Sequence, residues 1–318
     1  MSRSKEDLLR KGGLFIPLIF SFGAACEDIP LDVFLDDPTK ISNSIRTINN
    51  FFQADGIVCC GNEDMLSEVF RCAASMSEGA LCDPGDKEFA ALMETEINEL
   101  AGKGRPAVTL EAARRLRVLM PDSVLLAVIA GPVRIAGRLT GKRPVETLDH
   151  PDFLGLTTKA VLTFMRSMGE AGADIFLVRE DFSEPMGPKY SAVLNRCYSP
   201  LWNTAKFYGM HALLMPERCP PENVPLFKKI VDKIVFPPGS ARESVGMFKK
   251  PSFSIPWSLL EKTPGEIEAS LSEGFIMETV HSRKAFLITT DQEVPESVDK
   301  ERMIEGIKTI KDLFEVGA

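Results

Sequence analysis

The sequence has no uninterrupted apolar stretch of the roughly 20 residues that a membrane-spanning helix requires, so we expect a soluble protein with no membrane partner. It also has no excess of basic residues, because 45 acidic residues outweigh 37 basic ones and give a formal charge of −8. A general nucleic-acid-binding protein needs a basic face that displaces the counterions of the phosphate backbone. The charge balance therefore argues against that class, while a local basic pocket for an anionic substrate stays compatible with it.

Paired cysteine motifs are absent as well. The seven cysteines include no Cys-x-x-Cys, and their odd number does not suit a complete disulfide framework. Cys59 and Cys60 are neighbours inside an apolar run, which is typical of buried thiols. This cysteine usage predicts a reducing, cytoplasmic compartment.

The N-terminal segment contains a pattern that resembles a secretory leader. Basic residues precede the apolar segment Leu14–Phe22, and Gly23-Ala24-Ala25-Cys26 resembles a lipoprotein cleavage box. Two features argue against a leader: Pro17 interrupts the apolar run, and the acidic pair Glu6-Asp7 lies where a leader should be basic. We therefore interpret Leu14–Phe20 as a buried strand.

Short apolar segments alternate with amphipathic ones along the whole chain. Apolar runs without polar alternation are typical of strands that are covered on both faces, whereas apolar residues at spacings of three and four predict helices. The predicted strands are Leu14–Phe20, Gly56–Cys60, Val124–Ala130, Ala173–Val178, Phe207–Leu214, Lys233–Phe236, Pro251–Ile255 and Ala285–Thr290. The predicted helices are Pro38–Phe52, Thr109–Met120, Thr158–Ala171, a helix that begins at Pro264 after the N-cap Thr263, and Asp299–Phe314.

Eight strands that alternate with helices predict a (β/α)₈ TIM barrel. A doubly wound sheet would also alternate, but no Gly-x-Gly-x-x-Gly follows the first predicted strand. No repeat of 20–50 residues and no linker rich in proline, glycine or serine divides the chain. We therefore expect a single barrel domain over residues 1–318.

In such a barrel the active site lies where the strands end and the following loops begin. The candidate catalytic residues at these positions are Asn62, Glu180, Asp181 and His211. The candidate substrate-binding residues are Phe22, Arg134, Arg179 and Tyr208. We expect the four catalytic candidates to lie together at the mouth of the barrel.

Each polar candidate also has a purely structural explanation. Glu63-Asp64 is most simply the start of a helix, which is the interpretation we favour. Arg179-Glu180-Asp181 could form a solvated loop, although three charges directly after a buried strand face the mouth in this fold. His211 lies inside an apolar run, where a neutral core histidine is common, whereas His150 and His281 are expected at the surface.

Six segments occur in the order seen in the uroporphyrinogen decarboxylase superfamily, which the chain resembles from about Leu14 to the last helix. They are Phe15–Leu18, Phe51–Ile57, Val128–Pro132, Glu170–Asp174, Tyr208–His211 and Glu293–Ser297. The resemblance implies a (β/α)₈ barrel. It also implies one of two activities: decarboxylation of uroporphyrinogen, or methyl transfer to or from a cobalamin-carrying protein or a thiol.

The sequence departs from the decarboxylase pattern. The loop after the first strand, Ser21–Cys26, contains no arginine, whereas the decarboxylases use arginines there to pair with the carboxylates of the porphyrinogen. The catalytic aspartate of the family falls near Asn62, and its tyrosine after the third strand falls near Arg138. We therefore expect no useful uroporphyrinogen decarboxylase activity.

The zinc-binding pattern of the methyltransferases is also incomplete. In the methyltransferases that the chain resembles, a His-x-Cys on strand five and a cysteine after strand eight hold a zinc ion, and the zinc activates a thiol. This chain keeps His211 but has Leu213 and Gln292 at the cysteine positions. We predict no metal site and no tightly bound cofactor. The alternative ligand sets are His211 with Glu217 and Cys219, or His211 with Glu180.

The resemblance therefore favours a divergent member that demethylates a small methylated substrate, with the cobalamin carried by a partner corrinoid protein. Glu180, Asp181 or His211 would act as general acid on the departing oxygen, and Phe22 and Tyr208 would hold a flat or apolar substrate. Two alternatives stay open: a non-catalytic ligand-binding barrel, and a carboxy-lyase anchored by one of Arg134, Arg138 and Arg179. A homodimer also stays open.

Overall fold

The computed structural model describes residues 5–77, 79–83, 85–97, 102–273 and 275–315. It is mixed α/β, and every strand pair among these residues is parallel. One four-stranded sheet has the order β1 (Leu14–Phe15), β8 (Leu287–Thr290), β7 (Ser252–Ile255) and β6 (Val235–Phe236). The other has the order β2 (Gly56–Cys60), β3 (Val124–Ala130), β4 (Ile175–Glu180) and β5 (His211–Pro216).

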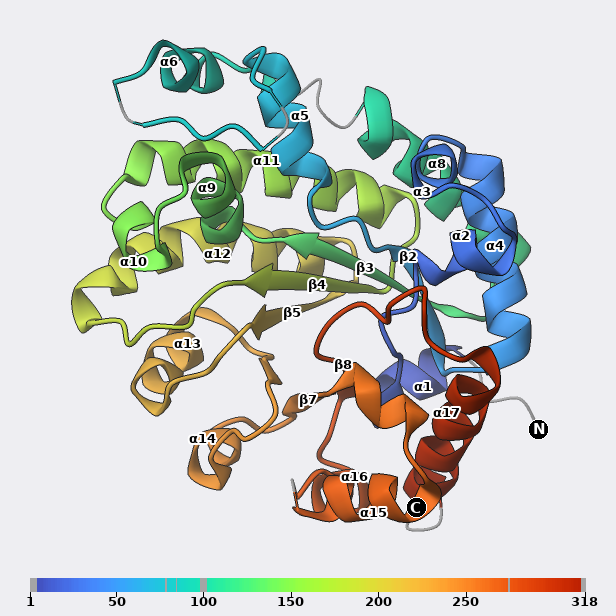
Figure 1. Ribbon diagram of the computed structural model, residues 1–318. Helices are drawn as coiled ribbons and strands as arrows, with labels where there is room; N and C mark the ends of the chain where they lie inside the picture. Colours follow the sequence, from blue (N-terminus) through green and yellow to red (C-terminus); the bar gives the residue numbers. More distant parts are fainter. Residues whose placement is uncertain (1–4, 78, 84, 98–101, 274, 316–318) are drawn as a thin grey trace.

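The two sheets meet at two sparsely bonded seams. An isolated parallel bridge joins Leu214 of β5 to Ile234, directly before β6. At the other seam the amide of Asp55, directly before β2, donates to the carbonyl of Phe15 in β1 at 3.1 Å. The strands therefore follow one another in chain order around the structure, with the helices outside them (Figure 1).

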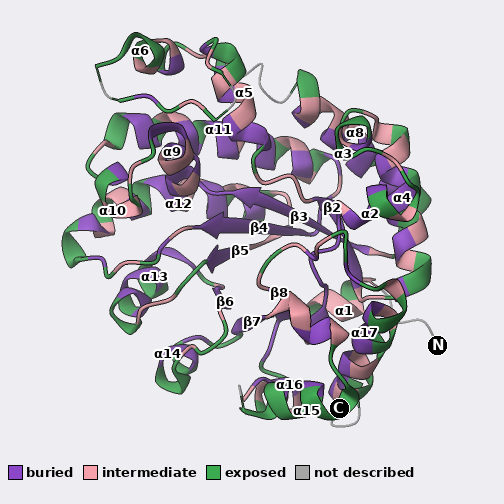
Figure 2. Cartoon of the chain, in the orientation of Figure 1, coloured by how far each residue is buried: buried purple, intermediate pink, exposed green. Residues whose placement is uncertain are grey.

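Helices surround the strands (Figure 1). They are α1 (Lys5–Lys11), α2 (Phe22–Cys26), α3 (Leu31–Leu35), α4 (Pro38–Phe52), α5 (Met65–Ala73), α6 (Lys87–Met93), α8 (Gly104–Leu119), α9 (Pro132–Thr140), α10 (Pro144–Thr147), α11 (Pro151–Glu170), α12 (Ser191–Phe207), α13 (Val224–Ile230), α14 (Arg242–Gly246), α15 (Pro264–Glu273), α16 (Ile276–His281) and α17 (Lys300–Glu315). Figure 2 shows buried strands surrounded by helices whose outer faces are exposed. Of the helices formed by the described residues, none is both long and apolar enough to traverse a bilayer.

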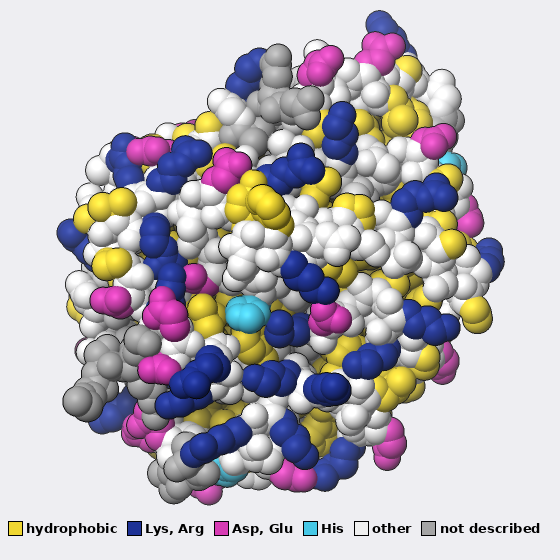
Figure 3. Space-filling view, turned by 180° about the vertical axis from the view of Figure 1, so that it is seen from behind, with side chains coloured by type: hydrophobic (Ala, Val, Ile, Leu, Met, Phe, Trp, Pro, Cys, Tyr) yellow, Lys and Arg dark blue, Asp and Glu magenta, His cyan; other side chains and the backbone are white. Residues whose placement is uncertain are grey.

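The acidic surplus of the chain is not evenly distributed over its surface. Figure 3 shows the molecule from behind, where Lys and Arg side chains gather over the lower half of the visible face. A negative net charge is therefore compatible with locally basic regions.

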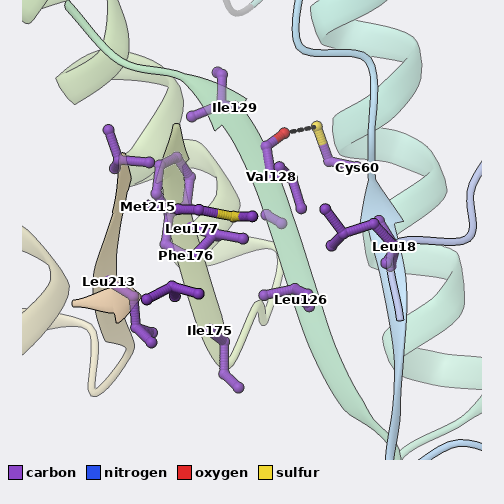
Figure 4. Close-up of a cluster of buried hydrophobic side chains, with 14 of the residues drawn as sticks. Leu18, Cys60, Leu126, Val128, Ile129, Ile175, Phe176, Leu177, Leu213 and Met215 are labelled. Atoms are coloured by element: carbon purple, nitrogen blue, oxygen red, sulfur yellow. Dashed lines mark hydrogen bonds between the residues drawn. The ribbon is translucent and has the colours of Figure 1, made fainter. Parts of the chain in front are cut away.

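The core between the strands is apolar and closely packed. Side chains of neighbouring strands, among them Leu126, Leu177 and Leu213, point toward one another in Figure 4 and are fully buried. The buried Cys60 donates its Sγ–H to the carbonyl of Val128 at 3.5 Å, which satisfies a thiol that has no access to water (Figure 4). The prediction that Cys59 and Cys60 are buried thiols is confirmed.

The structure confirms the bounds predicted for β2, β3 and α4 and shifts the bounds of other elements. The first strand ends at Phe15, since Pro17 has no amide hydrogen and Leu18 N bonds instead to the Thr290 hydroxyl at 2.9 Å. The fifth strand starts at His211 rather than at Phe207, because α12 continues to Phe207 and Gly209 then turns the chain at φ +69°. This shift of β5 decides which residues reach the site.

Candidate functional site

A cavity of about 600 Å³ opens at the carboxyl ends of the strands, the end at which α/β barrels carry their active sites. Its walls come from the loops after β1, β2, β5 and β8, from the end of β4, and from the first turns of α9. The charged and amide side chains that line it are Asn62, Glu63, Asp64, Arg134, Arg138, Arg179, Glu217, Arg218, Asp291, Gln292 and Glu293. The lining is therefore strongly polar and contains both signs of charge.

Glu63 is the centre of the charge network in this cavity. Its carboxylate is ion-paired with the guanidinium of Arg179, and its Oε2 lies 3.5 Å from Arg134 Nη2 and 4.0 Å from Arg138 Nη2. The side chains of Glu63 and Arg179 are only 13% and 9% exposed. Burial of a carboxylate is tolerable when cations compensate it, so Glu63 and the three arginines form one interdependent unit.

Arg179 lies on the floor of the cavity. It is the second-last residue of β4, and its Nη2 donates to the carbonyl of Asp291 after β8 at 2.9 Å. Because successive side chains of a strand point to opposite faces, Arg179 faces the cavity and Glu180 faces the surrounding helices.

Glu180 is fully buried and supports the wall of the cavity from behind. Its carboxylate accepts hydrogen bonds from Val133 N at 3.2 Å, from Arg134 N at 2.6 Å and from the Tyr198 hydroxyl. Burial raises the pKa of Glu180 to about 8, against the effect of these hydrogen bonds. Glu180 thereby fixes the first turn of α9, which carries Arg134 into the cavity, and it does not line the cavity itself.

Asp181 lies beside the cavity and Asn62 lines it, as the sequence predicted. Asp181 is ion-paired with Arg134, and burial together with the neighbouring Glu217 raises the pKa of Asp181. Asn62 Oδ1 accepts a hydrogen bond from Asp64 N at 3.2 Å, which fixes the turn into α5. Arg134 and Arg179 also line the cavity.

Arg138 is the third arginine of the wall, one helical turn beyond Arg134, so both side chains lie on the same face of α9. It is ion-paired with Asp64. Burial and the adjacent Arg134 lower the pKa of Arg138, so this is a cation that a further negative group in the cavity would stabilise.

Glu293 is a site residue that the sequence interpretation did not single out. It lines the cavity after β8, and its Oε1 accepts a hydrogen bond from Ser21 N. Burial raises the pKa of Glu293, and no ion pair among the described residues includes it. Glu293 is therefore a candidate proton donor among the carboxyl groups that line the cavity.

The placement expected for His211 is wrong. His211 begins β5 opposite Ile175, whereas the carboxyl end of β5 is Pro216, opposite Glu180. Glu217 lies six positions after His211, a distance of roughly 20 Å along an extended chain. His211 therefore lies at the opposite end of the strands from the cavity, so the four catalytic candidates do not gather at one mouth.

Phe22 and Tyr208 do not line the cavity either. Phe22 is buried between α2 and α4, with its ring centroid 5.8 Å from that of Phe52. Tyr208 follows the last residue of α12, and its hydroxyl donates to Glu170 Oε1 at 3.1 Å. Phe22 was expected in a loop after the first strand, but it is the first residue of α2. Tyr208 was expected within the fifth strand, but it precedes β5.

The residues at the positions of the implied zinc ligands do not form a zinc site. His211 is remote from Gln292 and Glu217, and Leu213 is buried in the core. Burial raises the pKa of the Cys219 thiol to about 12, which disfavours the thiolate that zinc requires. Over the described ranges no three His, Cys, Asp or Glu side chains are grouped as metal ligands.

We predict that the purified protein contains far less than one zinc per chain. The physical reason is that, within the described ranges, His211 belongs to no group of three His, Cys, Asp or Glu side chains that could hold the ion. Elemental analysis after dialysis measures this directly. One zinc per chain that disappears in His211→Ala would contradict the prediction.

Glu63 and Glu293 were missed because their surroundings in the sequence are uninformative. Glu63 was interpreted as a helix start, and Asp64 does precede α5. One signal was available: Arg179 follows a buried strand, and a buried arginine requires a carboxylate partner. The sequence does not say that this partner lies 116 residues earlier.

Comparisons with known proteins show the fold. No family model matches the chain, and no curated protein matches it. A methyltransferase from Methanosarcina mazei is similar over 98% of this chain and 99% of its own, at 15% identity and a TM-score of 0.74. A Listeria monocytogenes protein assigned as a vitamin-B12 independent methionine synthase is similar over 96% of both chains, at 12% identity and a TM-score of 0.54. The structure is thus a mixed α/β fold with parallel sheets of the TIM-barrel type.

Proposed function

We propose that this protein is an enzyme that removes a methyl group from a small substrate and passes it to a cobalamin carried by a partner corrinoid protein. The observation that carries the proposal is the polar cavity at the carboxyl ends of the strands, in a chain whose whole length resembles the fold of a methyltransferase. We include in the proposal that the two sheets form one (β/α)₈ barrel, interrupted at the two seams.

In this proposal Glu293 supplies the proton of the reaction. When its carrier protein docks, cobalamin provides the acceptor of the methyl group. The substrate oxygen that loses the methyl group takes up a proton, and Glu293 lines the cavity with a pKa raised by burial. Glu293 thus replaces Glu180 and His211, which do not line the cavity, and Asp181, which is ion-paired with Arg134. Glu63 and Arg179 position the substrate from the floor.

A carboxy-lyase that acts on a carboxylate other than uroporphyrinogen is the second candidate. The observation in its favour is that Arg134, Arg138 and Arg179 all line the cavity. Guanidinium groups bind carboxylates with paired hydrogen bonds. In that reaction carbon dioxide would be released, which distinguishes it from methyl transfer.

The test is a spectroscopic titration of the purified protein with a reduced corrinoid protein and a panel of O-, N- and S-methyl donors. We expect the cobalamin absorbance to change with one donor class. Glu293→Gln should slow the change by about a hundredfold, the lower range for loss of a general acid. Tyr208→Phe, at the end remote from the cavity, is the matched control and should react normally. Release of carbon dioxide without methylation would favour the carboxy-lyase. If neither reaction occurred, the non-catalytic ligand-binding protein would be favoured.

A further inference from the structure

Lys233 occupies an unusual environment at the amino ends of the strands, away from the cavity. It precedes β6 and is partly buried. Its Nζ lies 3.1 Å from His211 Nδ1 and 5.1 Å from the centroid of the Phe286 ring. A lysine amine thus contacts an imidazole and an aromatic ring where a carboxylate would be the usual partner.

The carboxylates around Lys233 are engaged by other cations. Among the described residues no ion pair includes Lys233, and the adjacent Asp232 is paired with Lys206 at 3.1 Å. The other acid on this side is Asp174, whose carbonyl accepts a hydrogen bond from His211 N. Asp174 is itself paired with Lys5 at 3.0 Å and with Arg117. Among the described residues Lys233 therefore has no carboxylate in a direct ion pair with it, although Asp232 still favours its charged form through space.

Cations face Lys233 from two further elements. Burial has the largest effect and lowers the pKa of Lys233. Lys250, which precedes β7, and Lys206 of α12 act in the same direction, and Asp232 acts against them. Burial also lowers the pKa of His211 to about 4, so the imidazole is neutral at pH 7. A neutral imidazole has a lone pair that accepts the Lys233 N–H.

We propose that Lys233 is a carbonyl-reactive amine that binds a small aldehyde bearing an anionic group. Lysines become nucleophilic when they are desolvated and placed beside other cations, and both conditions hold here. Lys250, which is in no ion pair among the described residues, would attract the anionic group of the aldehyde. This site is independent of the function proposed for the cavity, because it lies at the opposite end of the strands.

The chemical step is the formation of an imine. The neutral Nζ of Lys233 bonds to the carbonyl carbon, and the carbonyl oxygen leaves as water, so that both amine hydrogens end in that water molecule. His211 Nδ1, at 3.1 Å, is placed to take a proton from the attacking nitrogen and return it to the departing hydroxyl. No oxidant or reductant is required.

The test uses pyridoxal 5′-phosphate, an aldehyde with a phosphate group, as the probe on the full-length protein. Imines formed at a series of pH values are reduced with borohydride and located by peptide mass spectrometry. At pH 7.5 we expect Lys233 to be modified several-fold faster than the exposed Lys229, because a lowered pKa leaves more of the amine neutral. The comparison takes place within one intact chain, so it does not depend on any variant folding.

Matched variants assign the effect to its source. Lys233→Arg should remove the rapid adduct, and Lys229→Arg should leave it unchanged. His211→Gln should slow adduct formation at Lys233 several-fold while the circular dichroism spectrum stays the same. The proposal is overturned if the probe modifies the exposed lysines and Lys233 at equal rates. It is also overturned if the reaction at Lys233 rises only near pH 10, as for an ordinary lysine.

Discussion

Replacing Arg179 by methionine is expected to lower the free energy of unfolding by about 3–5 kcal/mol, the range found when one partner of a buried ion pair is removed. Methionine is similar in length and leaves little empty space, so the loss reports charge rather than volume. Glu63 would keep only the longer contacts to Arg134 and Arg138, at 3.5 and 4.0 Å. The carbonyl of Asp291 would lose its hydrogen bond from Arg179. Urea denaturation at pH 7 measures the change.

Two further variants make this result specific. Arg179→Met combined with Glu63→Gln should be more stable than Arg179→Met alone, because no uncompensated carboxylate remains in the cavity. Arg143→Met is the matched surface control. Arg143 is paired with Glu146 and Glu184 but is largely exposed, so its replacement should hardly move the unfolding midpoint. Equal effects of Arg179→Met and Arg143→Met would refute the idea that the cavity network is one unit.

Gly131→Ala is expected to lower the free energy of unfolding by about 3 kcal/mol, at the upper end of the range for overpacking a filled site. A Cβ at this position would lie 2.0 Å from Glu180 Oε1 and 2.7 Å from Val178 Cγ1. The carboxylate of Glu180 would have to leave the amides of Val133 and Arg134, and the first turn of α9 would lose its hydrogen-bond acceptor. The backbone of Gly131 is not strained, with φ −80°, so the effect is one of space.

Gly155→Ala in α11 is the control for this variant. Apart from its chain neighbours and the backbone of its own helix, no heavy atom of the described residues lies within 4 Å of a Cβ at Gly155. Alanine favours a helix over glycine by up to about 1 kcal/mol, so this variant should be as stable as the parent protein or slightly more stable. The explanation for Gly131 fails if the two alanine variants unfold at the same urea concentration.

The sequence predicted those parts of the fold whose signal is local. Val124–Ala130 is apolar throughout, and β3 has these bounds because both of its faces are covered. The bounds of β5 were not predictable, because Phe207 and Met210 are as apolar as the strand itself. Pairing with β4, from Ile175 opposite His211 to Glu180 opposite Pro216, sets the register of β5, and this is a tertiary contact.

The same limit applies to the site. Arg134 and Arg179 line the cavity because Arg134 lies in the first turn of the helix after β3 and Arg179 lies near the carboxyl end of β4. His211 was misplaced by the error in β5, and Glu63 became recognisable only when β2, β4 and α9 were brought together. Charge networks that join distant segments leave no periodic trace in the sequence, whereas buried strands do.

The double role of Glu180, as the last residue of β4 and the acceptor for the first turn of α9, bears on how the substrate range of this cavity can evolve. Glu180 fixes the positions of both Arg179 and Arg134, so a substitution that moves one of these arginines also displaces the other. Diversification is easier in the loops after β5 and β8. The side chains of Arg218 and Gln292 line the cavity there and form no hydrogen bond or ion pair within the described part of the chain. We expect these two positions to tolerate substitution and to be the first to adapt when a related protein accepts a larger or smaller substrate.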